Sequence, residues 1–124
     1  NQKYHRPVFV IYEEADLWAP QKWDSLTKPV LMSTSKITLR GRKLGISPIF
    51  ICPRPAEIAK TPLNESNIRI FGHLSGKEDV KALEWYLKGS GIAPTELDAL
   101  DIGEFLIKNK FGLQKIRTRH QTWS

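Results

Sequence analysis

Two adjacent carboxylates, Glu13 and Glu14, directly follow an uninterrupted apolar run over residues 7–12. The run lacks the polar–apolar alternation of a half-exposed strand, so it predicts a parallel strand that is covered on both faces. Ligands of open α/β sheets bind at the carboxyl ends of such strands. In a nucleotide hydrolase, one carboxylate at this place holds Mg²⁺ and the next orients the attacking water. The alternative is two surface acids at the junction of a strand and a loop.

A strand that presents these acids requires further strands and helices around it. Apolar runs predict further strands, and segments with helical periodicity predict helices between them. The expected elements are an ordered loop over 17–30, a helix over 31–44, strands over 46–52 and 67–74, a helical turn over 56–60, helices over 78–87 and from Pro94, and a hairpin of strands 103–107 and 113–117. This order predicts an α/β fold with a mainly parallel sheet and an antiparallel hairpin edge.

Four short segments of the chain follow one another in a fixed order and spacing. Residues 8–16 read as an apolar run followed by Glu-Glu-Ala-Asp, and residues 41–58 carry Gly-Arg-Lys-Leu-Gly before a strand that ends in Cys-Pro-Arg-Pro-Ala-Glu-Ile. Residues 66–79 and residues 97–105, which end in Leu-Asp-Ile-Gly-Glu-Phe, complete the set. Over roughly residues 7–107 they resemble the second half of the motor domain of HerA/FtsK-class P-loop ATPases, from the Walker B strand to the closing hairpin.

The resemblance implies a RecA-like P-loop NTPase fold and an ATP-driven, hexameric motor on DNA, with ATP and Mg²⁺ as cofactors. By position, Glu13 would be the magnesium-side acid and Glu14 the catalytic, water-activating glutamate. Arg42 would act on the γ-phosphate of a neighbouring subunit, and Arg54 would be a further catalytic arginine. The alternatives are a partner of the helix dipole for Arg42 and a structural ion pair in a loop for Arg54.

Departures from the family pattern bear on hydrolysis. Glu13 stands where the family usually has Asp, and Pro53 stands where it has a phosphate-sensing Gln, although proline lacks both a side-chain donor and an N–H. No G-x-x-x-x-G-K-[ST] phosphate loop occurs, and the nearest string, residues 72–78, is one residue short and ends in a carboxylate. Position 1 is not Met, and a buried-type strand follows within about eight residues. We therefore expect residues 1–124 to form one partial domain whose upstream half supplies the phosphate loop.

The end of the chain is basic. Net charge is +6, and residues 108–120 contain no acid. We expect this C-terminal segment, 108–124, to contact DNA phosphates without reading sequence. Alternation predicts that Lys115 and Arg117 share a face with Leu113, continued by Arg119 if the strand extends. The alternative is a charged edge strand that prevents edge-to-edge pairing. The expected DNA-binding residues are Lys108, Lys110, Lys115, Arg117 and Arg119, with His120 beside them.

Composition excludes several other classes. No apolar run approaches the ~18 residues of a membrane span, and no signal peptide opens the chain. One cysteine, Cys52, excludes an internal disulfide and fits a cytoplasmic location. The three histidines lie too far apart in sequence for a zinc site. Trp18 and Trp23 are expected to pack under a loop rather than stack on bases.

Two functions stay open at this stage. The first is part of an ATP-driven DNA translocase, helicase or packaging motor, with or without a nuclease or other DNA-processing partner. The second is a degenerate α/β domain that binds DNA or a protein without hydrolysing nucleotide. The acids Glu13 and Glu14 favour the first, whereas Pro53 and the missing phosphate loop favour the second.

Overall fold

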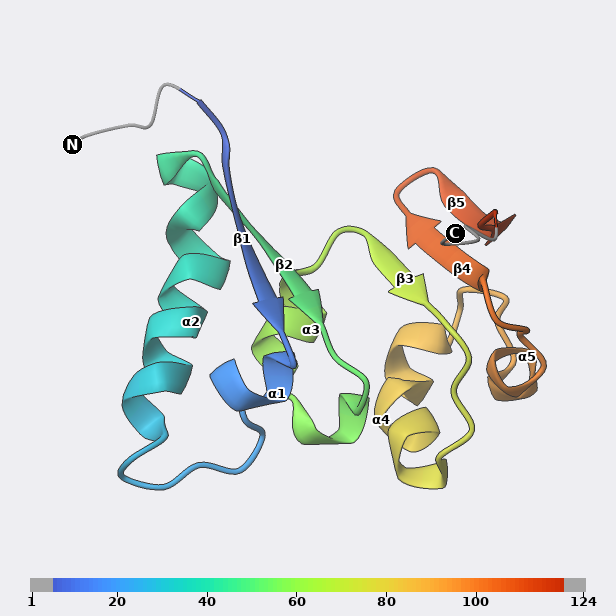
Figure 1. The fold of residues 1–124 in the computed structure, drawn as a ribbon, viewed down its shortest axis with the longest axis horizontal. Coiled ribbons are helices and arrows are strands. Elements are labelled where there is room, and N and C mark those ends of the chain that lie inside the picture. The colour runs from blue at the N-terminus through green and yellow to red at the C-terminus, as the bar shows by residue number, and fades with distance from the viewer. Residues whose placement is uncertain (1–5, 120–124) are drawn as a thin grey trace, which may run out of the picture. The chain divides into compact units, whose positions relative to one another are not determined.

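The computed structural model describes residues 6–119 (Figure 1). The chain divides after Ser66 into two compact units, Asn1–Ser66 and Asn67–Ser124. Each unit has its own sheet and its own hydrophobic core. His5 and His120, which the sequence analysis named, lie outside the described residues.

The first unit is built on a parallel pair of strands. Strand β1 pairs with β2 over six registered positions, from Val8 opposite Ile46 to Glu13 opposite Ile51. Both strands were predicted, and both follow β-branched or aromatic runs that favour extended backbone. In order, the elements are β1 Val8–Glu13, α1 Ala15–Trp18, α2 Lys28–Arg40, η1 Gly41–Leu44, β2 Ile46–Ile51, η2 Pro55–Glu57 and α3 Lys60–Glu65.

One face of the β1–β2 sheet carries the core of this unit. Tyr12 is buried at 8% exposure and stacks on Phe50, with ring centroids 5.1 Å apart. Helix α2 contributes Leu31 and Ile37 to the same cluster. The buried members of the cluster are Tyr12, Ala15, Ala19 and Ile58.

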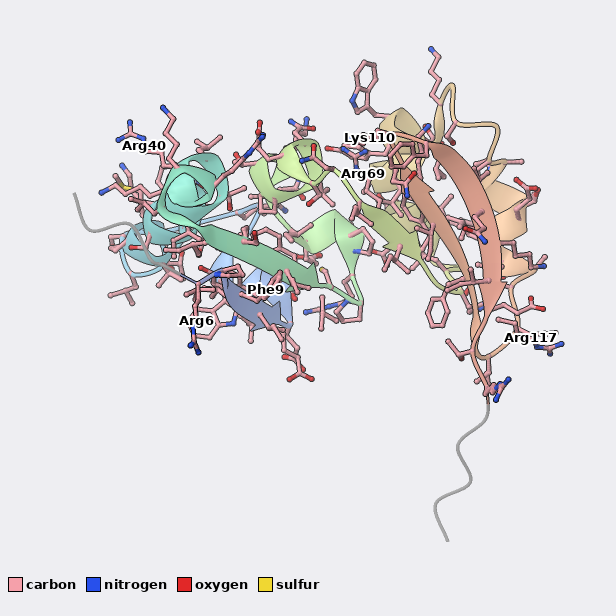
Figure 2. The ribbon with its side chains drawn as sticks, turned by 90° about the horizontal axis from the view of Figure 1, so that it is seen from above. Arg6, Phe9, Arg40, Arg69, Lys110 and Arg117 are labelled. Atoms are coloured by element: carbon pink, nitrogen blue, oxygen red, sulfur yellow. The ribbon has the colours of Figure 1, made fainter. Side chains whose placement is uncertain are left out.

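The opposite face of the β1–β2 sheet is open within residues 6–119. Phe9 and Ile11 are each 63% exposed, and Ile51 is 52% exposed. Phe9 lies across the sheet from α2 (Figure 2). The prediction that this strand is covered on both faces is therefore wrong for the described residues. The apolar pattern calls for cover on two faces, whereas the described chain packs against only one.

Local signals at the start of α2 shorten the loop that was expected over residues 17–30. Asp24 Oδ1 accepts the backbone N–H groups of Leu26 and Thr27, each at 2.9 Å, and this turn leads into the helix. Pro29 then occupies the first helical turn, where a missing N–H costs no hydrogen bond. The two prolines had suggested a loop, but one of them starts a helix.

The second unit pairs a three-stranded antiparallel sheet, in the order β3-β4-β5, with two helices. The predicted hairpin is confirmed as β4 and β5, and β3 is shorter than the predicted strand 67–74. Leu97, Leu83 and Leu106 lie in its core. The elements are β3 Arg69–Phe71, α4 Lys77–Leu87, α5 Pro94–Asp98, β4 Glu104–Asn109 and β5 Gly112–Arg117.

The fold class is α/β, as the sequence predicted. Among the described strands, the parallel pairing is that of β1 with β2, and β3 joins the hairpin in an antiparallel sheet. No helix in residues 6–119 is long and apolar enough to cross a membrane.

Candidate nucleotide and nucleic-acid site

The carboxyl ends of β1 and β2 lie at one edge of the parallel sheet. Glu13 is the last residue of β1 and stands opposite Ile51, the last residue of β2. Both Glu13 and Glu14 are exposed at this edge. Neither forms an ion pair with another described residue, so both carboxylates are available to a ligand.

Glu14 has an unusual backbone. Its φ of 49° and ψ of 58° place it in the left-handed region, where no other non-glycine residue of the described chain is found. This conformation costs an L-residue with a Cβ about 1–2 kcal/mol. The Glu14 carbonyl accepts the N–H of Leu17 at 2.9 Å, which starts α1. Strained residues of this kind concentrate at functional sites, so the backbone singles out Glu14 rather than Glu13.

An ion pair links helix α1, which follows β1, to the loop that follows β2. Arg54 Nη2 lies 3.0 Å from Asp16 Oδ2; Asp16 is 8% exposed and the Arg54 side chain 63%. Each residue stands three positions beyond the registered pair of Glu13 and Ile51. The pair matches the structural alternative for Arg54. Asp16 was not predicted as its partner, although the equal offset of the two residues from neighbouring parallel strands was a usable signal.

Arg42 does not join this edge in one chain. It lies in η1, before the amino end of β2, where the N–H of Val8 donates to the carbonyl of Gly45 at 2.9 Å. Six residues of extended strand separate the two ends of the sheet by about 20 Å. Arg42 can therefore serve such a site only in another copy of the chain, which is how the sequence analysis placed it.

Packing and backbone conformation explain the two glycines near Arg42, Gly41 and Gly45. A Cβ on Gly41 would meet the carbonyl oxygen of Ile46 at 3.0 Å, and Gly45 has a φ of 77°. The first glycine allows close approach to β2, and the second ends the helical turn. The spacing of the Gly-Arg-Lys motif thus follows partly from packing.

Glu13 suits a magnesium site as one donor. Mg²⁺ is typically held by one or two carboxylates together with phosphate oxygens and waters. The described residues contain no cluster of three or more His, Cys, Asp or Glu side chains that could hold a metal ion by themselves. Glu13 would supply one carboxylate ligand to the ion, and the nucleotide, water or other residues would supply the remaining ligands.

The glycine-containing loop over residues 72–76 does join a strand to a helix. Helix α4, however, carries Glu78 and Asp79 in its first turn. Carboxylates there oppose a bound phosphate by like-charge repulsion. The structure therefore opposes phosphate binding by this loop, as its short spacing and terminal carboxylate in the sequence had indicated.

The hairpin displays its basic residues unevenly. Register puts Leu113, Lys115 and Arg117 on one face of β5, as alternation predicted. Lys115 Nζ lies 3.4 Å from Glu104 Oε2. The Asp101 N–H, and then Lys115 and Arg117, lower the pKa of Glu104. The strand ends at Arg117, so Arg119 does not continue it, contrary to the extension considered from sequence.

Known proteins resemble the chain in sequence and in fold. No protein-family model matches the sequence. The chain is 30% identical over 108 residues to "Probable helicase MJ1565" of Methanocaldococcus jannaschii, a match that covers 86% of this chain and 20% of that protein.

Solved structures of the genome packaging NTPase B204 from Sulfolobus turreted icosahedral virus 2 resemble the chain in fold. The complex with ATP-gammaS superposes with a TM-score of 0.72 at 14% identity, over 90% of this chain and 52% of that one. The complex with sulfate gives 0.72 at 15% identity, over 92% and 55%. The chain thus has the fold of part of a P-loop NTPase domain and spans about half the length of this neighbour.

Proposed function

We propose that this chain is the water-activating part of an ATP-driven motor domain of the HerA/FtsK class that moves DNA. The observation that carries the proposal is Glu14, an exposed carboxylate in a left-handed conformation at the carboxyl end of a parallel strand. The similarity to a protein named a helicase and the fold of a packaging NTPase support an ATP-driven motor in general.

In this proposal the two acids have different roles. Glu14 accepts a hydrogen bond from the attacking water and polarises it, and Glu13 would supply a carboxylate to the shell of a bound Mg²⁺. A bound Mg²⁺ would neutralise charge on the β and γ phosphates. The Glu13 side chain is one methylene longer than that of Asp, the family's usual residue at this position, and it carries the same carboxylate.

The phosphate cradle must come from residues outside this chain. The open face of the β1–β2 sheet supports an upstream half that packs there, because Phe9, Ile11 and Ile51 otherwise leave a contiguous apolar surface in water. Such a half would cover the face that the apolar pattern of β1 predicts to be buried, and would bring the phosphate loop to the same edge of the sheet.

The arginines have separate roles in this scheme. We assign Arg42 to the γ-phosphate bound by a neighbouring subunit of a hexamer, since its own sheet edge is about 20 Å away. Arg54 reaches nucleotide from the loop after β2, with Asp16 holding its Nη2 atom in place. Lys108, Lys110, Lys115, Arg117 and Arg119 contact DNA phosphates, and the assembly works in the cytoplasm.

A degenerate domain that binds DNA or a protein is the second candidate. The observation in its favour is Pro53, which lies just beyond the carboxyl end of β2 and has no hydrogen-bond donor for a phosphate. This candidate retains the fold and the basic hairpin but assigns no catalysis to Glu14.

The test is Glu14→Gln in the longest natural form of the protein. The amide keeps the shape of the side chain and loses its charge, so ATP turnover should fall on the order of 10²-fold or more. Nucleotide affinity, measured by titration with a fluorescent ATP analogue, should stay the same. Glu57→Gln, which changes an exposed acid of the same unit, serves as the control and should leave turnover unchanged.

Two outcomes would contradict the proposal. If nucleotide affinity falls as far as turnover, Glu14 is a binding or folding residue. If the natural protein has no ATP turnover that depends on Glu14, the second candidate, a domain that binds without hydrolysing nucleotide, is correct.

A further inference from the structure

The turn of the β4–β5 hairpin displays an aromatic ring to solvent. Phe111 is 86% exposed at the tip. Its N–H donates to Asn109 Oδ1 at 2.8 Å, and Asn109 pairs with Gly112 to close the turn. Gly112 has a φ of 129°, a conformation that side chains rarely adopt. The backbone of the turn is thus braced, and the ring projects from a defined position.

The same tip is positively charged. Lys110 Nζ lies 5.0 Å from the centroid of the Phe111 ring, and Lys108 stands opposite Arg69 in the sheet. Neither Lys108 nor Lys110 forms an ion pair within residues 6–119. Arg69 and Lys110 lie at one end of this sheet and Arg117 at the other (Figure 2).

Charge therefore varies along the hairpin. At the end away from the tip, Glu104 pairs with Lys115 and stands opposite Arg117. No acid occurs between Phe105 and Lys115, so the positive charge at the tip has no compensating carboxylate on the hairpin. An exposed ring among uncompensated cations has the two elements of a site for unpaired bases: a surface for stacking and charges for the flanking phosphates.

We propose that the hairpin tip binds single-stranded nucleic acid, with Phe111 stacked on an unpaired base and Lys108 and Lys110 on the neighbouring phosphates. This inference extends the proposed function. It rests on that function for one point, namely that the bound polymer is DNA. A paired and stacked base hides its π-face inside the duplex, so the ring distinguishes single strands, whereas lysines alone would not. The positive charge at the tip, which has no acid beside it on the hairpin, favours a polyanion over a protein surface of mixed charge.

The experiment measures binding of a mixed-sequence oligodeoxynucleotide, single-stranded or as a duplex, to the natural protein without nucleotide. One 2-aminopurine in the strand reports stacking through its fluorescence. Because stacking of a base on an aromatic side chain contributes ~1–3 kcal/mol, Phe111→Ala should weaken single-strand binding by roughly 5- to 150-fold. Duplex binding should not change, and the quenching of 2-aminopurine should be lost.

Matched variants separate stacking from bulk and charge. Phe111→Trp should retain binding, and Phe111→Leu, which is apolar but not aromatic, should not. Ile102→Ala removes another solvent-exposed apolar side chain of the same unit, 87% exposed, and should have no effect. The double variant Lys108→Ala with Lys110→Ala should lose about two phosphate contacts. The slope of log affinity against log salt concentration should then become shallower by ~1.4 on single strands.

Several results would overturn the proposal. They are equal weakening of single-strand and duplex binding by Phe111→Ala, no change in either, or no binding by the unmodified protein. A change in oligomeric mass on Phe111→Ala, measured by light scattering, with nucleic-acid binding intact would assign the ring to a protein contact instead. Glu14→Gln should leave this binding unchanged. The binding assay therefore tests the role of the hairpin tip, and the ATP-turnover assay separately tests the role of Glu14.

Discussion

At the residue scale, Glu14 combines the chemistry of its side chain with an unfavourable backbone. The left-handed conformation lets the chain leave β1 and enter α1 within a single residue, since Ala15 already begins the helix. Glycine would adopt this conformation without strain but carries no carboxylate. Under the proposed function, Glu14 is therefore a position at which function and stability favour different residues.

This conflict predicts that Glu14→Gly is more stable than Glu14→Ala by about 1 kcal/mol. Both variants lose the carboxylate, so the difference between them isolates the backbone. The measurement is the free energy of unfolding in urea for the two proteins.

A control at a position with ordinary backbone should reverse the sign. Glu57 has no positive φ, and glycine there should be less stable than alanine because it adds chain entropy to the unfolded state. If Glu14→Gly is no more stable than Glu14→Ala, the turn at Glu14 does not require a left-handed residue.

At the element scale, β4 is tied to its surroundings through Glu104. Its Oε2 accepts the N–H of Asp101 at 3.1 Å and faces Lys115 at 3.4 Å. These contacts stabilise the charged form, so they lower the pKa of Glu104 in the folded state. The carboxylate thereby closes the turn that leads into β4 and attaches β5 at the same end.

The direction of this pKa shift predicts how stability depends on pH. The unfolded state protonates with a pKa of about 4.3, above the folded value, so the stabilisation by Glu104 is complete above that pH. It is lost as the pH falls through the lower pKa of the folded protein. The wild type should therefore be more stable than Glu104→Gln at pH 7, and the two midpoints of denaturation should converge as the solution is acidified below about pH 4.

Glu84→Gln is the comparison for this experiment. Glu84 is an exposed acid of α4 for which the described structure contains no ion pair. Its midpoint difference from wild type should vary little over the same pH range. A Glu104→Gln difference that is constant from pH 7 to acid would mean that the ionised carboxylate contributes nothing to the hairpin.

At the scale of the whole molecule, the chain has two acids at the carboxyl end of a parallel strand and no phosphate-loop motif in its sequence. Positioning of the phosphates accounts for most of phosphoryl-transfer catalysis. We therefore expect the purified chain of 124 residues to show no steady ATP hydrolysis, measured as phosphate release over hours.

The decisive control uses the same preparation with Glu14→Gln. Steady phosphate release that this substitution abolishes would show that the chain holds a complete hydrolytic site, and that the phosphate loop is not required from elsewhere. Release that the substitution leaves unchanged would come from a contaminating ATPase.

Much of the architecture could be predicted from sequence because its signals are local. Apolar runs placed β1 and β2, helical periodicity placed α4, and Asn109 with Gly112 placed the hairpin turn. Glu13 and Glu14 could be assigned to a strand end because the apolar run stops immediately before them. Each of these features depends on neighbours within a few residues.

Other features depend on contacts between segments far apart in the chain, and only the tertiary structure decided them. The register of β1 with β2 brings Asp16 to Arg54 across 38 positions of sequence and places Arg42 at the other end of the sheet. The open face of that sheet and the exposure of Phe111 are likewise properties of packing. A sequence pattern states what a side chain prefers locally, whereas register and burial are set by which distant segments pack against it.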